Sequence, residues 1–264
     1  MVERRREQLA ALLREQSYLP VSRICERLGV SEATARRDLA VLESERRVLR
    51  TYGGALSEFN RQFTSFSERC NHAVSGKRWI GRAAAALVGD GMTVFMDSGT
   101  TVYAVAVELA NGWSGGRLKV VTNNLPVAEG LSASESCEVH LLGGQFLGRQ
   151  SVLLGRRALR ALRGWRFDLL FFGAQGLDAD GAWNSTREIV EFQQAAIERA
   201  RRSLLCVDRT KFGRRAPAAL FGWDAMPPLV TDAGGGDFGR LGRRIGDAEV
   251  VADADAAAAT GVAV

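Results

Sequence analysis

Two adjacent arginines, Arg36 and Arg37, lie in a short polar stretch and could bind a phosphate or a base. The stretch begins with Ser31, a residue type that commonly starts helices, so both arginines are predicted to lie on the body of a helix. Adjacent helical positions point about 100° apart, so the two guanidinium groups cannot do the same work. We expect one of them to contact a phosphate or a guanine base, and the other to pair with Asp38 or another neighbour.

A second polar stretch, Asp97-Ser98-Gly99-Thr100-Thr101, follows an apolar strand-like run and precedes a predicted helix. Free backbone N–H groups at a helix start, together with hydroxyl groups and the helix dipole, form a good cradle for a phosphate. Asp97 would repel a phosphate but could accept hydrogen bonds from sugar hydroxyls. The alternative is an ordinary strand–turn–helix connection with a Ser or Thr cap.

Three more polar or flexible segments follow predicted strands, and ligands of parallel sheets bind at the carboxyl ends of strands. Asparagine can donate and accept, which suits hydroxyl recognition, and adjacent glycines allow close approach of the backbone. A lysine could pair with a phosphate or a carboxylate, although a solvated surface lysine is the alternative. These segments are Thr122-Asn123-Asn124, Gly143-Gly144 and the one that holds Lys211.

Neither a metal site nor a cofactor is expected. The four cysteines have no C-x-x-C spacing, and the two histidines are far apart, so no zinc-ligand pattern exists. A chain of 264 residues does not need disulfides to fold, so we expect free thiols in a reducing cytoplasm. The N-terminus leads into an amphipathic helix, and no apolar run has the length of a membrane span.

The elements around the arginine pair predict a helix-turn-helix. Leucines at helical spacing indicate a first helix over 2–16, and Ile24 and Leu28 indicate a second helix after Pro20. Gly29 can close that helix in the left-handed conformation, and Ser31 can cap the next. The helix after such a turn enters the major groove by its N-terminal part. The DNA-contacting candidates on it are Ser31, Glu32, Thr34, Arg36 and Arg37.

A short β-like run over 48–52 stops at Gly53-Gly54 and is typical of the wing of a winged helix. Arg50 and Tyr52 would then lie beside the phosphate backbone. The charge supports this placement: the chain has 35 basic and 30 acidic residues, and residues 1–57 hold 11 arginines against 8 acidic residues. A local basic excess is what a DNA-facing surface needs.

Residues 58–75 predict a linker helix with an apolar stripe of Phe59, Phe63 and Phe66, which would dock on the body or on a second subunit. From residue 76 to 251, short apolar strands alternate with helices, which predicts a parallel sheet covered by helices on both faces. Residues 151–162 and 187–202 are expected to be helical. The alanine-rich residues 252–264 are expected to form a frayed tail. The fold class is thus α/β, with a winged helix-turn-helix domain over 1–57.

Taken together, these ordered motifs resemble the DeoR-type family of bacterial transcription regulators over nearly the whole chain. The resemblance implies an effector-sensing domain similar to ribose-5-phosphate isomerases, repression of sugar-catabolism operons, release by a phosphorylated sugar, and a homo-oligomer. It adds a ligand contact at Gln175, where Asn is common in the family. Three departures stand out: Ala35 replaces an isoleucine, Glu45-Arg46-Arg47 stands where a glycine is usual, and Trp183-Asn184 replaces the catalytic lysine loop of the isomerases.

Two alternatives remain open from the sequence. The first is a sugar-phosphate isomerase or transferase with a DNA-binding appendage, for which Asp97, Asp178 and Glu188 are candidate bases. No convergent acid–base pair stands out, so the main expectation is a protein that is not an enzyme. The second alternative is an activator of the same architecture, which the sequence does not separate from a repressor.

Overall fold

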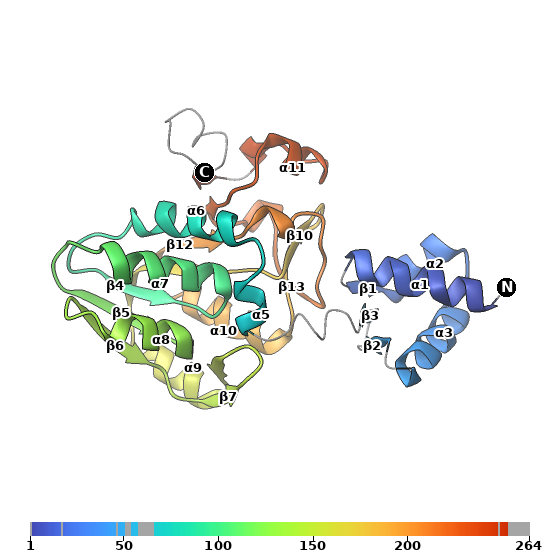
Figure 1. Cartoon of the computed structure of the whole chain (residues 1–264), viewed down its shortest axis with the longest axis horizontal. Coiled ribbons are helices and arrows are strands. Elements are labelled where there is room, and N and C mark those ends of the chain that lie inside the picture. Colours follow the sequence, from blue (N-terminus) through green and yellow to red (C-terminus); the bar gives the residue numbers. More distant parts are fainter. Residues whose placement is uncertain are drawn as a thin grey trace.

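The computed structural model describes residues 2–16, 18–45, 47–50, 54–57, 66–247 and 249–252. In Figure 1 the N-terminal elements, in blue, form a group of their own, and the remaining elements build a larger layered domain. Within these residues, no helix combines the length and the apolar character that crossing a bilayer requires.

The predicted helix-turn-helix is confirmed. Helix α1 spans Val2–Gln16, α2 spans Val21–Leu28 and α3 spans Glu32–Ser44. Gly29 closes α2 with a φ of 62°, a left-handed conformation that glycine adopts without the steric cost of a Cβ. The Ser31 side chain accepts a hydrogen bond from the Thr34 backbone N–H and so caps α3. The three helices share one core of buried residues, which includes Leu9, Leu13, Ile24, Ala35, Leu39 and Leu42.

The wing consists of β2 (Val48–Arg50) and β3 (Gly54–Ser57), which pair antiparallel. The predicted strand over 48–52 is confirmed over 48–50, and residues 51–53 lie outside the described residues. On its other side β3 pairs with β1 (Tyr18–Pro20), a three-residue strand too short for any periodicity to predict.

The linker differs from the single helix expected over 58–75. Phe59 and Phe63 lie outside the described residues, and the helix α5 covers only Phe66–Cys70. The next helix, α6, spans Val74–Ala85. The two are separate because Ala73 has a φ of 50°, which a continuous helix does not allow. Phe66 is buried and lies edge-on against Tyr103, so this part of the stripe docks on the body of the same chain.

The predicted parallel sheet is confirmed. Its seven strands run in the order β15-β14-β12-β9-β4-β5-β6, and every adjacent pair is parallel. The strands are β4 (Thr93–Met96), β5 (Leu118–Thr122), β6 (Cys137–Leu141), β9 (Phe167–Phe172), β12 (Ala200–Cys206), β14 (Leu229–Val230) and β15 (Val250–Ala252).

Helices cover both faces of this sheet (Figure 1). Side chains alternate along each strand, so Val94 and Met96 join one core while Phe95 joins the other. The first core includes residues of α6, α7 (Thr100–Gly112) and α8 (Leu125–Ser132). The second includes residues of α9 (Arg156–Arg163) and α10 (Arg187–Ile197).

Two predicted helices are wrong in extent. The first part of the helix expected over 151–162 is instead a strand, β8 (Val152–Leu154), which pairs antiparallel with β7 (Gln145–Leu147). The helix α9 begins after it, at Arg156. The helix expected over 187–202 ends at Ile197, because the chain enters the sheet and Ala200 pairs with Phe167. In both places tertiary pairing of the backbone overrides helical propensity.

A three-stranded antiparallel sheet beside the parallel one was not predicted. It consists of β10 (Gly176–Asp178), β11 (Gly181–Asn184) and β13 (Ala218–Gly222). The remaining elements are short: the helix α11 (Gly235–Gly239) and the 3₁₀ turns η1 (Arg209–Lys211), η2 (Trp223–Ala225) and η3 (Ile245–Asp247).

Candidate effector site and DNA-binding surface

The start of α3 is the candidate DNA-binding surface, and its side chains are accessible. Ser31, Glu32, Arg36 and Arg37 are exposed, and Thr34 is half-buried. Arg36 reaches back one turn to Glu32, with 3.4 Å between nitrogen and oxygen. Such an exposed pair contributes little to stability, so Arg36 can exchange it for a phosphate at small cost. The strand that carries Arg50 is described but its side chain is not, and Tyr52 lies outside the described residues.

Asp38 forms an ion pair with neither Arg36 nor Arg37. Its carboxylate is buried and accepts hydrogen bonds from Arg5 at 2.6 Å and from Arg6 at 3.1 Å, both on α1. Burial alone would favour the neutral acid, but the two guanidinium groups outweigh burial and hold the pKa of Asp38 below its ordinary value. Asp38 therefore joins α1 to α3 and leaves Arg37 without an ion pair among the described residues.

A cavity of about 360 Å³ opens at the carboxyl ends of β4, β9 and β12. We call it the sheet-edge cavity. Its polar lining residues are Arg69, His72, Lys77, Ser98, Thr100, Thr101, Gln150, Gln175, Asn184, Ser185, Asp208, Thr210, Lys211, Arg214 and Arg215, and Gly99 and Gly173 also line it. Six predicted effector-binding residues are among them: Ser98, Gly99, Thr100, Thr101, Gln175 and Lys211.

The N-terminus of α7 opens into the sheet-edge cavity. Gly99 precedes this 13-residue helix with a φ of 130°, a conformation available to glycine because it has no Cβ. Among the residues that the structure describes, no side chain caps this helix at Gly99, so its first backbone N–H groups lack a side-chain cap. Thr100 and Thr101 add hydroxyl groups beside them. This arrangement suits an anionic group such as a phosphate.

Four cationic residues gather around the end of β12 and form what we call the cationic cluster: Arg69, Lys77, Lys211 and Arg214. Burial lowers the pKa of Lys211 to about 8, while nearby Asp208 opposes the shift and the other three cations add to it. Burial also lowers the pKa of Lys77, and its ammonium donates to the backbone carbonyl oxygens of Arg69 and His72. Shifted pKa values in a group of neighbouring cations are typical of functional sites, so this cluster is a candidate site for binding an anion.

Asp208 is the one carboxylate among the described residues that line the cavity. It is fully buried, and its Oδ1 accepts hydrogen bonds from the backbone N–H and the hydroxyl of Thr210. Its Oδ2 has no hydrogen-bond partner among the described residues. Because a buried oxygen without a partner is costly, this atom is suited to accept a hydrogen bond from a ligand hydroxyl.

Asp97 lies beneath the cavity and does not line it. Gln193 on α10 donates a 2.6 Å hydrogen bond to its carboxylate, and the Gln193 carbonyl oxygen accepts one of 2.9 Å from Asn184, which does line the cavity. Burial raises the pKa of Asp97 to about 6, against the opposing effect of Gln193. Asp97 is thus connected to the lining residue Asn184 through Gln193, and a direct contact between Asp97 and a ligand stays a prediction.

Three further predicted residues have other contacts and do not line the cavity. Thr122 is buried and donates to the Met96 carbonyl oxygen at 2.6 Å. Asn124 caps α8 by accepting from the Val127 N–H at 3.1 Å. Asn123 is fully buried near Asp97, where it helps to lower that pKa, although its amide makes no hydrogen bond of good geometry to a described residue.

The two glycines Gly143 and Gly144 are also separate from the cavity. A Cβ on Gly144 would come within 2.4 Å of the Leu154 carbonyl oxygen and 3.1 Å of the Ala158 Cβ. The glycine is needed for close packing against β8 and α9, which the sequence could not show because β8 was predicted as helix. Gly143 is exposed.

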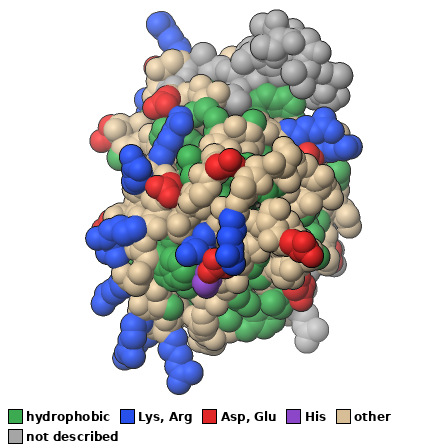
Figure 2. All heavy atoms as spheres, turned by 90° about the vertical axis from the view of Figure 1, so that its left-hand side faces the viewer, with side chains coloured by type: hydrophobic (Ala, Val, Ile, Leu, Met, Phe, Trp, Pro, Cys, Tyr) green, Lys and Arg blue, Asp and Glu red, His purple; other side chains and the backbone are tan. Residues whose placement is uncertain are grey.

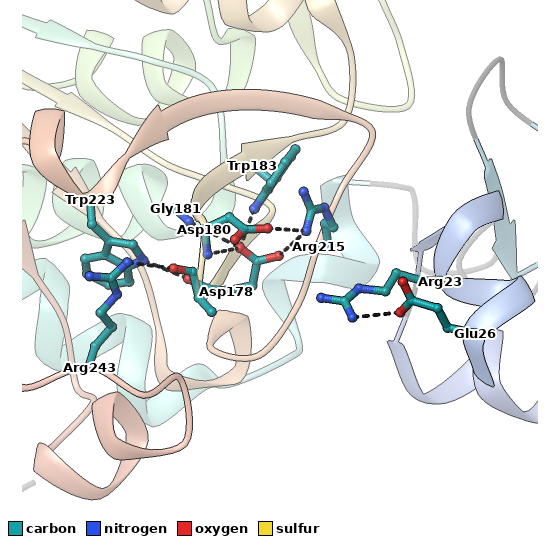
Figure 3. Close-up of polar contacts among 10 residues, drawn as sticks. Arg23, Glu26, Asp178, Asp180, Gly181, Trp183, Arg215, Trp223 and Arg243 are labelled. Carbon is teal, nitrogen blue, oxygen red and sulfur yellow. Dashed lines mark hydrogen bonds and ion pairs between the residues drawn. The ribbon is translucent and has the colours of Figure 1, made fainter.

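Arg215 lines the cavity and also contacts the small antiparallel sheet. Figure 3 shows its side chain beside Asp178, Asp180 and Trp183. Its guanidinium lies over the Trp183 ring at 3.8 Å and forms ion pairs with Asp178 at 3.1 Å and Asp180 at 2.7 Å. Asp178 also accepts from the Trp183 indole N–H and from the backbone of its own turn. Asp178 is thus fully engaged, and neither it nor Glu188 lines the cavity as a base would need to.

Sequence reasoning missed most of the basic lining residues. One of them could have been found: Lys77 falls on the buried face of α6 with Gly76, Ile80, Gly81 and Ala84, so a lysine stands at an apolar position. Arg69, Arg214 and Arg215 gave no comparable signal, because arginine is abundant along the whole chain. Among the described residues, no group of three His, Cys, Asp or Glu side chains is arranged to hold a metal ion.

Two family models match the chain in order. The DeoR-like helix-turn-helix domain matches residues 5–60, and the DeoR C terminal sensor domain matches residues 72–233. Among solved structures, ribose 5-phosphate isomerase A from Methanocaldococcus jannaschii is 16% identical, with a TM-score of 0.35 over 51% of this chain and 52% of that one. The tetrameric eIF2B-beta2-delta2 complex from C. thermophilum is also 16% identical, with a TM-score of 0.42 over 82% and 65%. Scores at this level support no functional argument.

Curated relatives are similar over most of their length. The glycerol-3-phosphate regulon repressor of Escherichia coli is 33% identical over 84% of this chain and 87% of the relative. The lactose phosphotransferase system repressor of Streptococcus mutans is 32% identical over 87% and 92%, and the HTH-type transcriptional repressor GlcR of Bacillus subtilis is 32% identical over 86% and 88%. With both domain models matched in order, the chain belongs to the DeoR family of transcriptional regulators.

Proposed function

We propose that this protein represses a carbohydrate-related operon and that a phosphorylated sugar bound in the sheet-edge cavity releases it from DNA. The family is one of regulators, and this chain is a regulator rather than an enzyme. The observation that carries the proposal is the cavity itself. It combines an uncapped helix N-terminus with four cations and a buried acceptor oxygen, and these groups suit a phosphoryl group on a hydroxylated carbon chain.

The N-terminus of α7, with Ser98, Thr100 and Thr101, would bind the phosphoryl group. The cationic cluster would supply the positive potential that attracts it, and Asn184, Gln175 and Asp208 would contact hydroxyl groups. Operator binding would use base contacts from the start of α3. Arg36, Arg37 and the wing residues Arg50 and Tyr52 would contact phosphates. The relatives named above are themselves repressors, which favours repression over activation.

Effector binding can release DNA only if it favours one of two arrangements of the molecule. We propose a homo-oligomer, in which two helix-turn-helix domains bind two half-sites and the effector changes their spacing. Light scattering of the purified protein with and without a half-site pair would determine the oligomeric state. Operator DNA and sugar phosphates are both found in the cytoplasm, so we place the protein there.

The first test is a thermal-shift screen with matched pairs of phosphorylated and free sugars. A ligand present at a hundred times its dissociation constant stabilises the native state by about 2.7 kcal/mol, which raises the melting temperature measurably. We expect a shift with one phosphosugar and none with its free sugar. If no phosphosugar in the panel shifts the melting temperature, the proposal is wrong about the ligand. A reporter gene in a deletion strain then separates repression from activation.

A further inference from the structure

Charge is distributed unevenly over the sensor domain. On the face shown in Figure 2, basic and acidic side chains are interspersed. The sheet-edge cavity, in contrast, is lined by five cationic side chains and one carboxylate, that of Asp208. Arg215 has its own partners in Asp178 and Asp180, which leaves Lys77, Lys211 and Arg214 with the carboxylate of Asp208 among the lining residues. One phosphoryl group, with a charge of about −1.5 to −2 at pH 7, could balance these cations only if it lay close to all of them.

The two groups of anion-binding residues belong to different strands of the sheet. The uncapped N-terminus of α7 follows β4, whereas Lys211 and Arg214 follow β12. Strand β9 lies between them in the sheet. Neighbouring strands are about 4.8 Å apart, so the two strand ends are separated by roughly 10 Å. A single phosphoryl group bound at the start of α7 does not cover that distance.

Asp208 adds a second kind of contact on the side of β12. Its fully buried Oδ2 lacks a partner among the described residues, and it needs a donor. An anionic group has no proton to donate there, but a hydroxyl group does. The lining therefore favours a ligand with an anionic group at each end and hydroxyl groups close to one of them.

We propose that the effector is a doubly anionic sugar derivative, such as a sugar bisphosphate or a phosphorylated sugar acid. One anionic group binds at the N-terminus of α7. The second binds Lys211 and Arg214 beyond the end of β12, beside a hydroxyl that donates to Asp208. This inference rests on the proposed function, because it specifies which phosphorylated sugars the same cavity selects.

Matched ligand pairs on the same carbon chain test the inference by isothermal titration calorimetry with the full chain. The probes are glycerol 3-phosphate against 3-phosphoglycerate, ribulose 5-phosphate against ribulose 1,5-bisphosphate, and fructose 6-phosphate against fructose 1,6-bisphosphate. We expect at least one doubly anionic probe to bind tenfold or more tightly than its singly anionic partner. Arg214→Gln should remove that advantage, because it takes away a cation from the subsite of the second anionic group.

Two variants keep the result interpretable. Arg160→Gln removes an equal charge from the exposed surface of α9 and should retain the full preference. Lys211→Gln should lose the preference as Arg214→Gln does, so a folding defect confined to one variant does not decide the outcome. Monophosphates that bind as tightly as their partners, or a preference that survives both variants, would overturn the inference alone. Absence of binding by every probe would overturn the proposed function and this inference together.

Discussion

At the scale of single residues, the two arginines that attracted attention first have different surroundings. Arg36 pairs with Glu32, whereas Arg37 is exposed and has no ion pair among the described residues. The carboxylate expected to hold one of them, Asp38, is instead bound by Arg5 and Arg6. Both arginines thus remain available to DNA, and neither stabilises the protein to any extent that would confuse a mutational test.

Arg37→Ala should weaken operator binding by about 1–3 kcal/mol without changing the melting temperature of the sensor domain. If Arg37 contacts a guanine, the loss is confined to operators with that base. If it contacts a phosphate, binding weakens equally on all sequences and the salt slope falls by about one unit. Gel-shift titrations at several salt concentrations measure both, with Arg160→Ala as a control. Unchanged affinity in Arg37→Ala and also in Arg36→Ala would refute the recognition-helix assignment.

If Lys211 binds the effector, effector binding should depend on pH. Its ammonium is the form that attracts an anion, and its pKa is lowered to about 8 by burial. If only that form binds, affinity should fall about tenfold between pH 7 and pH 9 as the proton is lost. Lys211→Arg should abolish the alkaline loss, because a guanidinium stays charged. Calorimetric titrations at pH 7, 8 and 9 check this, and a flat profile in the natural protein would contradict it.

The same group affects the stability of the ligand-free protein in the opposite direction. The folded pKa of Lys211, about 8, lies below its ordinary value of 10.5. The unfolded chain therefore binds more protons between those two values, and the free energy of unfolding should rise with pH across that window. Urea unfolding should show this rise in the free energy of unfolding for the natural protein and not for Lys211→Met, since the variant lacks the titrating amine.

At the scale of elements, helices of the two domains are held by buried polar contacts that the sequence did not show. In the sensor domain, Gln193 on α10 connects Asp97 at the end of β4 to Asn184 on β11. In the DNA-binding domain, Asp38 connects α3 to α1. Gln193 and Asp97 are 96 positions apart, and Asp38 and Arg5 are 33 positions apart, so local spacing in the sequence does not predict these contacts.

Gln193→Met should destabilise the sensor domain by about 1–3 kcal/mol, because it leaves a buried carboxylate without its shortest donor. Asp97 is ionised above its pKa of about 6, so the loss should be larger at pH 8 than at pH 5. Removing the donor also raises the pKa of Asp97 further. The fall in the free energy of unfolding with rising pH then extends to higher pH values. Urea unfolding at both pH values measures the effect. The double variant Asp97→Leu with Gln193→Met should recover part of it, and equal losses at the two pH values would exclude the proposed role of the charge.

Asp38→Asn should lower the melting temperature of the DNA-binding domain and weaken operator binding, while effector affinity stays unchanged. The amide cannot accept charge-assisted hydrogen bonds from both Arg5 and Arg6, so α3 loses its connection to α1. Because the folded pKa of Asp38 is lowered, the natural contact is present at neutral pH and is lost as the pH falls through that value. Circular dichroism melts and gel shifts of the same sample check both parts. A normal melt with lost DNA binding would instead indicate a direct contact with DNA.

At the scale of the whole molecule, the proposal requires that the cavity and the operator-binding surface be coupled. Coupling between two binding equilibria is reciprocal, so operator DNA must weaken effector binding by the same factor as effector weakens operator binding. We expect a factor of about 5–150. Effector titrations with operator duplex, with a scrambled duplex and without DNA measure it. An effector affinity that is identical in all three would show that the cavity does not control DNA binding.

The sequence by itself determined the order and type of the main elements. Helical periodicity, the left-handed Gly29 and the Ser31 cap are local signals, and the structure confirms all three. Short apolar runs between helices likewise predicted the parallel sheet, because strands buried on both faces carry continuous apolar residues. The candidate phosphate cradle at residues 98–101 could be predicted for the same reason: its N–H groups and hydroxyls come from consecutive residues, and these residues line the cavity.

Only the tertiary structure decided which polar residues meet. Six residues that follow strands as predicted do not line the cavity: Asp97, Thr122, Asn123, Asn124, Gly143 and Gly144. Four others come to the cavity from distant segments: Arg69, Lys77, Asp208 and Arg214. The order of strands in the sheet, with β12 and β9 beside β4, sets that convergence. Strand order depends on long-range pairing, which no local pattern encodes, and so the composition of the cavity could not be predicted from spacing alone.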